Sequence, residues 1–151
     1  MDDRHIYRGK RIGIHAGDNG EWAFGCNSYS GDGKNTIDVI NYLDQYEEMH
    51  VIDPDTLGQC TGLPDCNKKL IFEGDGVRLP ETGSLAYVEW GATEDLNRDP
   101  AVCDAWVLHW LSGRARAKFR TDLGYWADKV IVAGNIHDNP ELLREGENNE
   151  V

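Results

Sequence analysis

The sequence predicts a mainly β fold, and two observations carry this prediction. Many of the 17 glycines in the 151-residue chain stand where chain reversals are expected, as in residues 17–20 and 74–76. The apolar runs between the turns are short and rich in β-branched and aromatic side chains, which is typical of strands. The predicted strands lie in residues 6–7, 21–24, 36–42, 50–52, 69–72, 76–79, 86–90 and 129–133.

The segment between residues 99 and 120 fits two structures. It begins with Asp-Pro, which is typical of a helix start, and Trp106 and Trp110 follow at helical spacing. The alternation of Trp106, Leu108 and Trp110 would equally place all three on one face of a strand. We favour the strand, and the choice between strand and helix stays open at this point.

The C-terminal part of the chain carries a helix-start pattern. Asn139 is a typical N-cap residue, and Pro140 suits the first helical position. We therefore expect a short C-terminal helix after the last strand. The polar residues 145–151 are expected to form a disordered acidic tail.

The hydrophobic core is predicted from the apolar positions within the expected strands. These core candidates are Trp22, Phe24, Ile71, Phe72, Val77, Val88, Trp90, Val130 and Ile136.

Composition limits the class of protein. The chain has 15 Lys or Arg against 27 Asp or Glu, a formal net charge of −12. No apolar run reaches the roughly 20 residues that span a bilayer, and the first residues are acidic and polar, so we expect neither a membrane protein nor a secreted one. Because no signal peptide is recognisable, we expect the four cysteines to be reduced thiols and not disulfides. No pair of them has the C-x-x-C spacing of a zinc or redox site. We therefore expect a cytoplasmic location.

Recognisable catalytic and cofactor motifs are absent from the sequence. It has no phosphate loop and no nucleophile elbow, and its five histidines are not at the i, i+4 spacing of paired metal ligands. Glu73 and Asp75 offer two nearby carboxylates, but an acidic turn before a strand explains them better. Gln59 and Thr61 likewise fit a tight turn. We expect no enzyme activity, no catalytic residue, and no bound cofactor or metal.

Charge is segregated along the chain. Residues 35–67 contain seven acids and no Lys or Arg, whereas cations occupy every second position at Arg114, Arg116, Lys118 and Arg120. On a strand, these four cations would share one face. That face is a candidate site for a nucleic-acid backbone or for the acidic surface of another subunit, or it is simply a solvated face. The net charge of −12 opposes general DNA binding.

Three separated motifs occur in the order found in one known family. The first is Arg8-Gly9-Lys10 followed by Gly20-Glu21-Trp22. The second lies in residues 55–75 and includes Gly58, Gln59, Thr61, Gly62, Glu73, Gly74 and Asp75. The third lies in residues 134–143 and includes Asn135, Asn139 and Pro140. Together they resemble the phage YopX family over residues 5–144.

The resemblance implies a small cytosolic protein of a bacteriophage or prophage, with a mostly β fold that contains an SH3-like barrel. We accordingly expect an N-terminal β subdomain in residues 1–58, the SH3-like barrel in residues 59–144 and the tail in residues 145–151. Gly76 stands where the family usually has a β-branched residue, so we expect a bulge at the start of that strand.

These observations favour a non-enzymatic accessory protein that acts through protein–protein contacts. We expect its partner to be a second copy of itself, in a homo-oligomer, or else a host or phage protein. Two alternatives remain. One is a nucleic-acid-associated protein that uses the basic face, and the other is an acidic protein that mimics DNA and inhibits a host protein.

Overall fold

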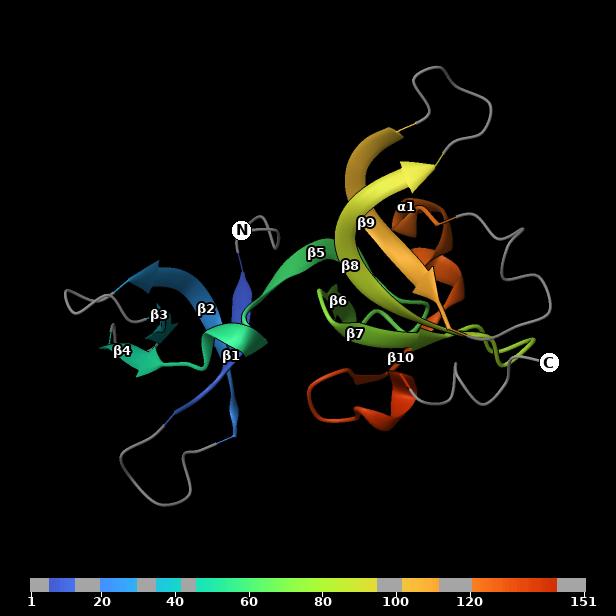
Figure 1. Ribbon diagram of the computed structural model, residues 1–151. Coiled ribbons are helices and arrows are strands. Elements are labelled where there is room, and N and C mark those ends of the chain that lie inside the picture. Colours follow the sequence, from blue (N-terminus) through green and yellow to red (C-terminus); the bar gives the residue numbers. More distant parts are fainter. Residues whose placement is uncertain are drawn as a thin grey trace. The chain divides into compact units, whose positions relative to one another are not determined.

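The computed structural model (Figure 1) describes residues 6–12, 20–29, 35–41, 46–94, 102–111 and 121–143. The chain divides into two compact units, Met1–Gly62 and Leu63–Val151. The described elements are mainly antiparallel strands, which confirms the predicted fold class. The basic segment at residues 114–120 and the tail lie outside the described residues.

The first unit is built around an antiparallel sheet with the strand order β4-β3-β2-β1-β5. Its elements are β1 (Tyr7–Lys10), β2 (Trp22–Tyr29), β3 (Asn35–Asn41), β4 (Tyr46–Val51), the 3-10 helix η2 (Pro54–Thr56) and most of β5 (Gly58–Pro64).

One face of this sheet carries the small core of the first unit. Ala23 and Ile52 are buried there, and Tyr7 and Leu57 pack against them. Gly9 pairs with Ala23 on the same face. A methyl group at Gly9 would overlap the Ile52 side chain, so only glycine lets β1 approach this closely.

The second unit contains an antiparallel sheet with the order β10-β7-β8-β9. Its elements are β6 (Leu70–Phe72), β7 (Asp75–Arg78), β8 (Leu85–Glu94), β9 (Val102–Trp110), α1 (Leu123–Trp126), the 3-10 helix η3 (Ala127–Lys129) and β10 (Ile131–Asn135). Figure 1 shows β8 and β9 as a long, strongly curved pair. The end of β5 also belongs to this unit, and β6 follows β5 in the hydrogen-bonded order.

The main core lies in the second unit, and its buried side chains come from β6, β7, β8 and β9, from the two helices, and from positions next to these elements. They are Ile71, Val77, Leu79, Ala86, Val88, Leu108, Trp110, Leu123, Ala127 and Val130. Five of the predicted core residues are confirmed as buried: Ile71, Phe72, Val77, Val88 and Val130.

Two core predictions are wrong, and two hold only in part. Phe24 is 47% exposed because β2 alternation places it on the face opposite Ala23. Trp90 is 55% exposed because β8 continues beyond the packed core. Trp22 and Ile136 are only partly buried.

Residues 102–110 form a strand, so the favoured prediction for that part is confirmed. The strand β5 and the helix α1 were not predicted, since glycines at 58 and 62 suggested turns and α1 is only four residues long. Both strand orders are open among the described residues, so the expected SH3-like barrel is not confirmed. No helix in the described part of the chain is long and apolar enough to span a membrane.

The expected irregularity at Gly76 is present, but on the neighbouring strand. The register shifts between Val132 and Gly134 of β10, opposite Gly76 and Val77 of β7. A Cβ atom at Gly76 would lie 2.6 Å from Cδ1 of Leu142, so the glycine leaves room for that buried side chain. Residues 141–143 are helical, as predicted.

Candidate functional site

The residues of the second motif lie mostly in β5 and in the turn before β7. Gln59 pairs with Tyr7, and Gly58 pairs with Arg8, both across the β1–β5 ladder. Thr61 is 3% exposed, and the Gly62 N–H donates to Cys60 Sγ at 3.4 Å. These groups are built into the strand, and this is a structural use of the motif.

Asp65 fastens the turn that follows β5. Asp65 is only 3% exposed. Its Oδ1 accepts the N–H groups of Asn67 and Lys69 at 2.8 and 2.9 Å. Oδ2 accepts the N–H of Val132 in β10 at 2.9 Å. A single carboxylate thus satisfies three backbone donors and links the turn to a distant strand.

The second and third motifs meet at Gly74. Its N–H donates to Val88 O at 2.8 Å, and its carbonyl accepts the Ile136 N–H at 2.9 Å. Asp75, 2% exposed, accepts the Phe72 N–H at 2.8 Å. Asp75 also pairs with Asn135 in the β7–β10 ladder. The Glu73-Gly74-Asp75 segment is therefore a tight, bonded turn.

Asn135 organises the third motif. Its Oδ1 accepts the N–H groups of His137 and Asp138 at 3.0 and 2.8 Å, and its Nδ2 donates to Asp138 Oδ2 at 3.0 Å. The Asn135 N–H in turn donates to Asn139 Oδ1 at 3.3 Å. That oxygen therefore holds the preceding turn. Pro140 accepts the Leu143 N–H through its carbonyl at 3.2 Å.

A cluster that the sequence did not reveal lies on β8 and β9. The rings of Tyr87 and His109 stack with centroids 4.8 Å apart, and His109 Nδ1 lies 3.5 Å from Glu89 Oε1. Burial raises the pKa of Tyr87, and the nearby Glu89 carboxylate raises it further by charge and by a hydrogen bond. The cluster therefore keeps Tyr87 in its neutral form. The cluster could not be predicted from the sequence, because the sequence does not show that residues 87 and 109 pair across β8 and β9.

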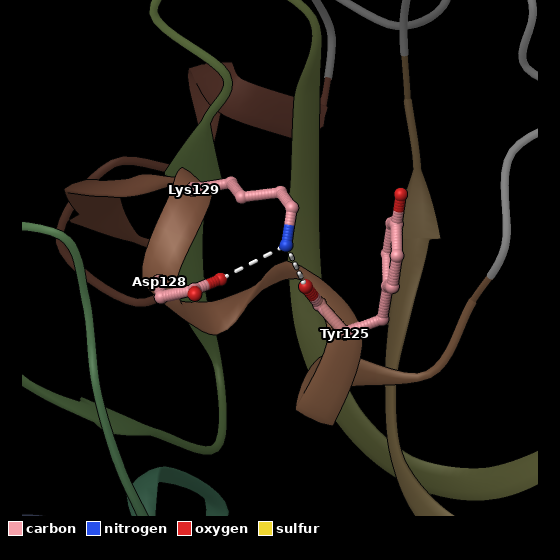
Figure 2. Close-up of polar contacts among 3 residues, drawn as sticks. All are labelled: Tyr125, Asp128 and Lys129. Atoms are coloured by element: carbon pink, nitrogen blue, oxygen red, sulfur yellow. Dashed lines mark hydrogen bonds and ion pairs between the residues drawn. The ribbon is translucent and has the colours of Figure 1, made fainter.

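Several aromatic rings reach the surface of the second unit. Trp90 packs edge-on against Trp106 with ring centroids 5.1 Å apart. A second group is formed by Tyr125 and Trp126, whose rings are 4.9 Å apart. In Figure 2, Lys129 Nζ donates to the Tyr125 carbonyl at 2.7 Å and to Asp128 Oδ1 at 3.0 Å. The same Nζ lies 4.3 Å from the Tyr125 ring centroid.

The first unit carries a face on which cations and aromatic rings meet. Lys10 pairs with Trp22, and Arg8 pairs with Phe24, across the β1–β2 ladder. Arg8 Cζ lies 4.5 Å and Lys10 Nζ lies 5.4 Å from the Trp22 ring centroid. We call these four residues the cation–aromatic face. Sequence reasoning missed it because the strand register brings its two halves together.

Several of the predicted motif residues lie in bonded turns or in the β1–β5 ladder. The side chains of Asp75, Asn135 and Asn139 accept main-chain N–H groups. No group of three or more His, Cys, Asp or Glu in the described segments is placed to hold a metal ion. Among the described residues, aromatic rings and cations meet at the surface in the groups described above. Both kinds of group are suited to binding.

The fold and these turns define a class of antiparallel β protein whose motifs maintain main-chain geometry. The family model described as YopX protein matches residues 16–144, and the chain belongs to the YopX family. The match includes the motifs at residues 20–22, 55–75 and 134–143, whereas Arg8-Gly9-Lys10 precedes it. A comparison with curated proteins found no match.

Proposed function

We propose that this YopX-family chain is a phage- or prophage-encoded accessory protein that acts through protein–protein contacts, and that its partner is a second copy of itself. The observation that carries the proposal is the exposed Trp90 side chain, which lies midway along the β8–β9 ladder. Self-association through this part of the strand pair would bury the ring.

The Trp90 position is continuous with the main core. Val88 and Leu108 pair within the core, and Trp90 and Trp106 form the next pair on the same face. Trp106 is partly buried against the core, while Trp90 is 55% exposed. Aromatic side chains are enriched at the centres of protein interfaces, and exposed apolar surface next to a packed core is typical of them. A twofold contact would bring the two Trp90 rings together.

The net charge gives the proposal a distinctive salt dependence. Two copies, each with a formal charge of −12, repel one another over long range. Added salt screens this repulsion and leaves the apolar contact intact. Self-association is therefore expected to strengthen with salt, whereas binding to nucleic acid would weaken.

The same proposal includes no catalytic step, no cofactor and no metal, and it places the protein in the cytoplasm of the bacterial host.

We retain the SH3-like barrel in residues 59–144 as part of the proposal. Two bonds support this part, because they tie the turn after β5 to the β10 side of the other sheet. They are Cys66 N–H to Val130 O at 3.0 Å and Val132 N–H to Asp65 Oδ2 at 2.9 Å.

Sedimentation velocity at low and high salt tests the proposal. The wild-type protein is expected to sediment as an oligomer whose population rises with salt, and Trp90→Ser is expected to shift it to monomer. Tyr125→Ser is the matched control, because Tyr125 is also an exposed ring, at 41%. A wild-type monomer at both salt concentrations would refute self-association, and equal loss in both variants would refute the Trp90 contact.

A further inference from the structure

The cation–aromatic face has the geometry of a stacking platform. Trp22 and Phe24 alternate with the buried Ala23 on β2, so both rings project from the face opposite the small core. Residues two apart on a strand are about 7 Å apart, a spacing that an extended nucleotide chain can span from base to base. Sheet faces with aromatic side chains bind single-stranded nucleic acid in this way.

Lys10 and Arg8 lie next to the aromatic rings, at positions where they could contact the phosphates of a nucleotide chain that stacks on the rings. Lys10 lies directly across from Trp22 in the ladder and is only partly buried. Arg8 is 6% exposed, and its guanidinium lies 4.5 Å from the Trp22 centroid, which fixes the orientation of the ring before any ligand arrives. Pre-ordering of this kind lowers the entropic cost of binding.

The local charge supports an anionic ligand despite the acidic chain as a whole. Residues 4–11 contain four Lys or Arg and no acid. Glu21, next to the platform in sequence, has its carboxylate 3.7 Å from Arg11. An acidic peptide would use the cations alone. The pair of rings on the same face favours a ligand with both negative charge and flat bases.

We propose that the cation–aromatic face binds single-stranded nucleic acid, with Trp22 and Phe24 stacking on two neighbouring bases and Lys10 contacting the phosphate between them. Arg8 acts as a positioning residue for the Trp22 ring. This site lies in the first unit and is independent of the Trp90 contact proposed for self-association.

Fluorescence anisotropy of a labelled oligothymidylate, titrated with the full chain over a range of salt concentrations, tests the site. Phe24→Ala removes one stacking ring from an exposed position and is expected to weaken binding about 5- to 150-fold. Lys10→Gln is expected to reduce the salt dependence by about one phosphate contact. The Lys10 N–H bond to Thr56 Oγ1 at 2.8 Å is a backbone bond, so it remains in the variant.

Ile12→Ala is the matched control, because Ile12 is 53% exposed in the same unit and stands two residues after the end of β1. Binding that Phe24→Ala weakens and Ile12→Ala leaves unchanged would support the site. Absence of binding at low salt, or an equal effect of both changes, would overturn it. Polyglutamate that competes fully with the oligonucleotide, with an affinity unaffected by Phe24→Ala, would also overturn it in favour of an acidic peptide.

Discussion

Replacing Asp65 should destabilise the second unit more than its position in a surface turn suggests. Asp65→Ala leaves three backbone donors without their acceptor, and each costs about 1–3 kcal/mol when it stays buried. Asn67 and Lys69 are exposed, so water can replace the carboxylate there. Val132 is partly buried in β10, so its N–H carries the larger penalty. We expect a total loss of about 2–5 kcal/mol.

Asp65→Asn separates the contribution of the two oxygens. The amide keeps one oxygen for Asn67 and Lys69 but presents an NH2 group to the Val132 N–H, so about 1–3 kcal/mol is expected to be lost.

Urea unfolding followed by tryptophan fluorescence measures both variants. Four of the five tryptophans lie in the second unit, so the signal reports mainly on it. Asp128→Ala is the control, since its 83% exposed side chain forms a surface ion pair worth about 0–1 kcal/mol. If Asp65→Ala were as stable as Asp128→Ala, the conclusion that the Asp65 hydrogen bonds stabilise the turn would be wrong.

The remaining predictions concern packing and protonation. Gly76→Ala should lower stability by about 1–3 kcal/mol, because the added methyl group displaces the buried Leu142 side chain; calorimetry on the variant would show an unchanged melting temperature if this contact were absent. Phe72→Ala should cost about 3–5 kcal/mol in urea unfolding, since Phe72 is 6% exposed, and a loss below 1 kcal/mol would contradict its burial. Burial, and secondly the Glu89 carboxylate, raise the pKa of Tyr87 above its ordinary value of 10.0. Just above pH 10.0 the folded chain therefore keeps the Tyr87 proton, whereas the unfolded chain releases it. This stabilisation is complete below pH 10.0 and is lost as pH rises through the raised pKa, so wild type should lose more stability at alkaline pH than Tyr87→Phe, and parallel profiles would refute the assignment.

Most of the strand content was accessible from local sequence, because each predicted strand contains β-branched or aromatic residues that favour extended backbone. All eight predicted strands overlap observed ones. The strand β5 escaped prediction because its glycines resemble turns, and only pairing with Tyr7 and Arg8 of β1 shows that it is a strand. The helix α1 begins with Leu-Gly and is held by the buried Leu123, which is a tertiary effect.

The candidate binding surfaces were less accessible than the fold. Alternation in β2 is visible in the sequence, but it does not say which face is buried, and Phe24 was assigned to the wrong one. The register between β1 and β2 decides that Lys10 meets Trp22, and register depends on contacts between distant segments. The motif residues were easier, since glycine, asparagine and aspartate in short runs are typical of bonded turns.

The placement of Asn135 and Asp75 has a consequence for how the family is understood. Both side chains belong to the motifs by which this chain resembles the YopX family, and both hold main-chain groups in place, which is the work of a scaffold. Two relatives with identical motifs are then free to differ in what they bind. Under the two proposals made above, relatives that differ at the positions of Phe24 and Trp90 are expected to differ in what they bind, even where their motifs agree.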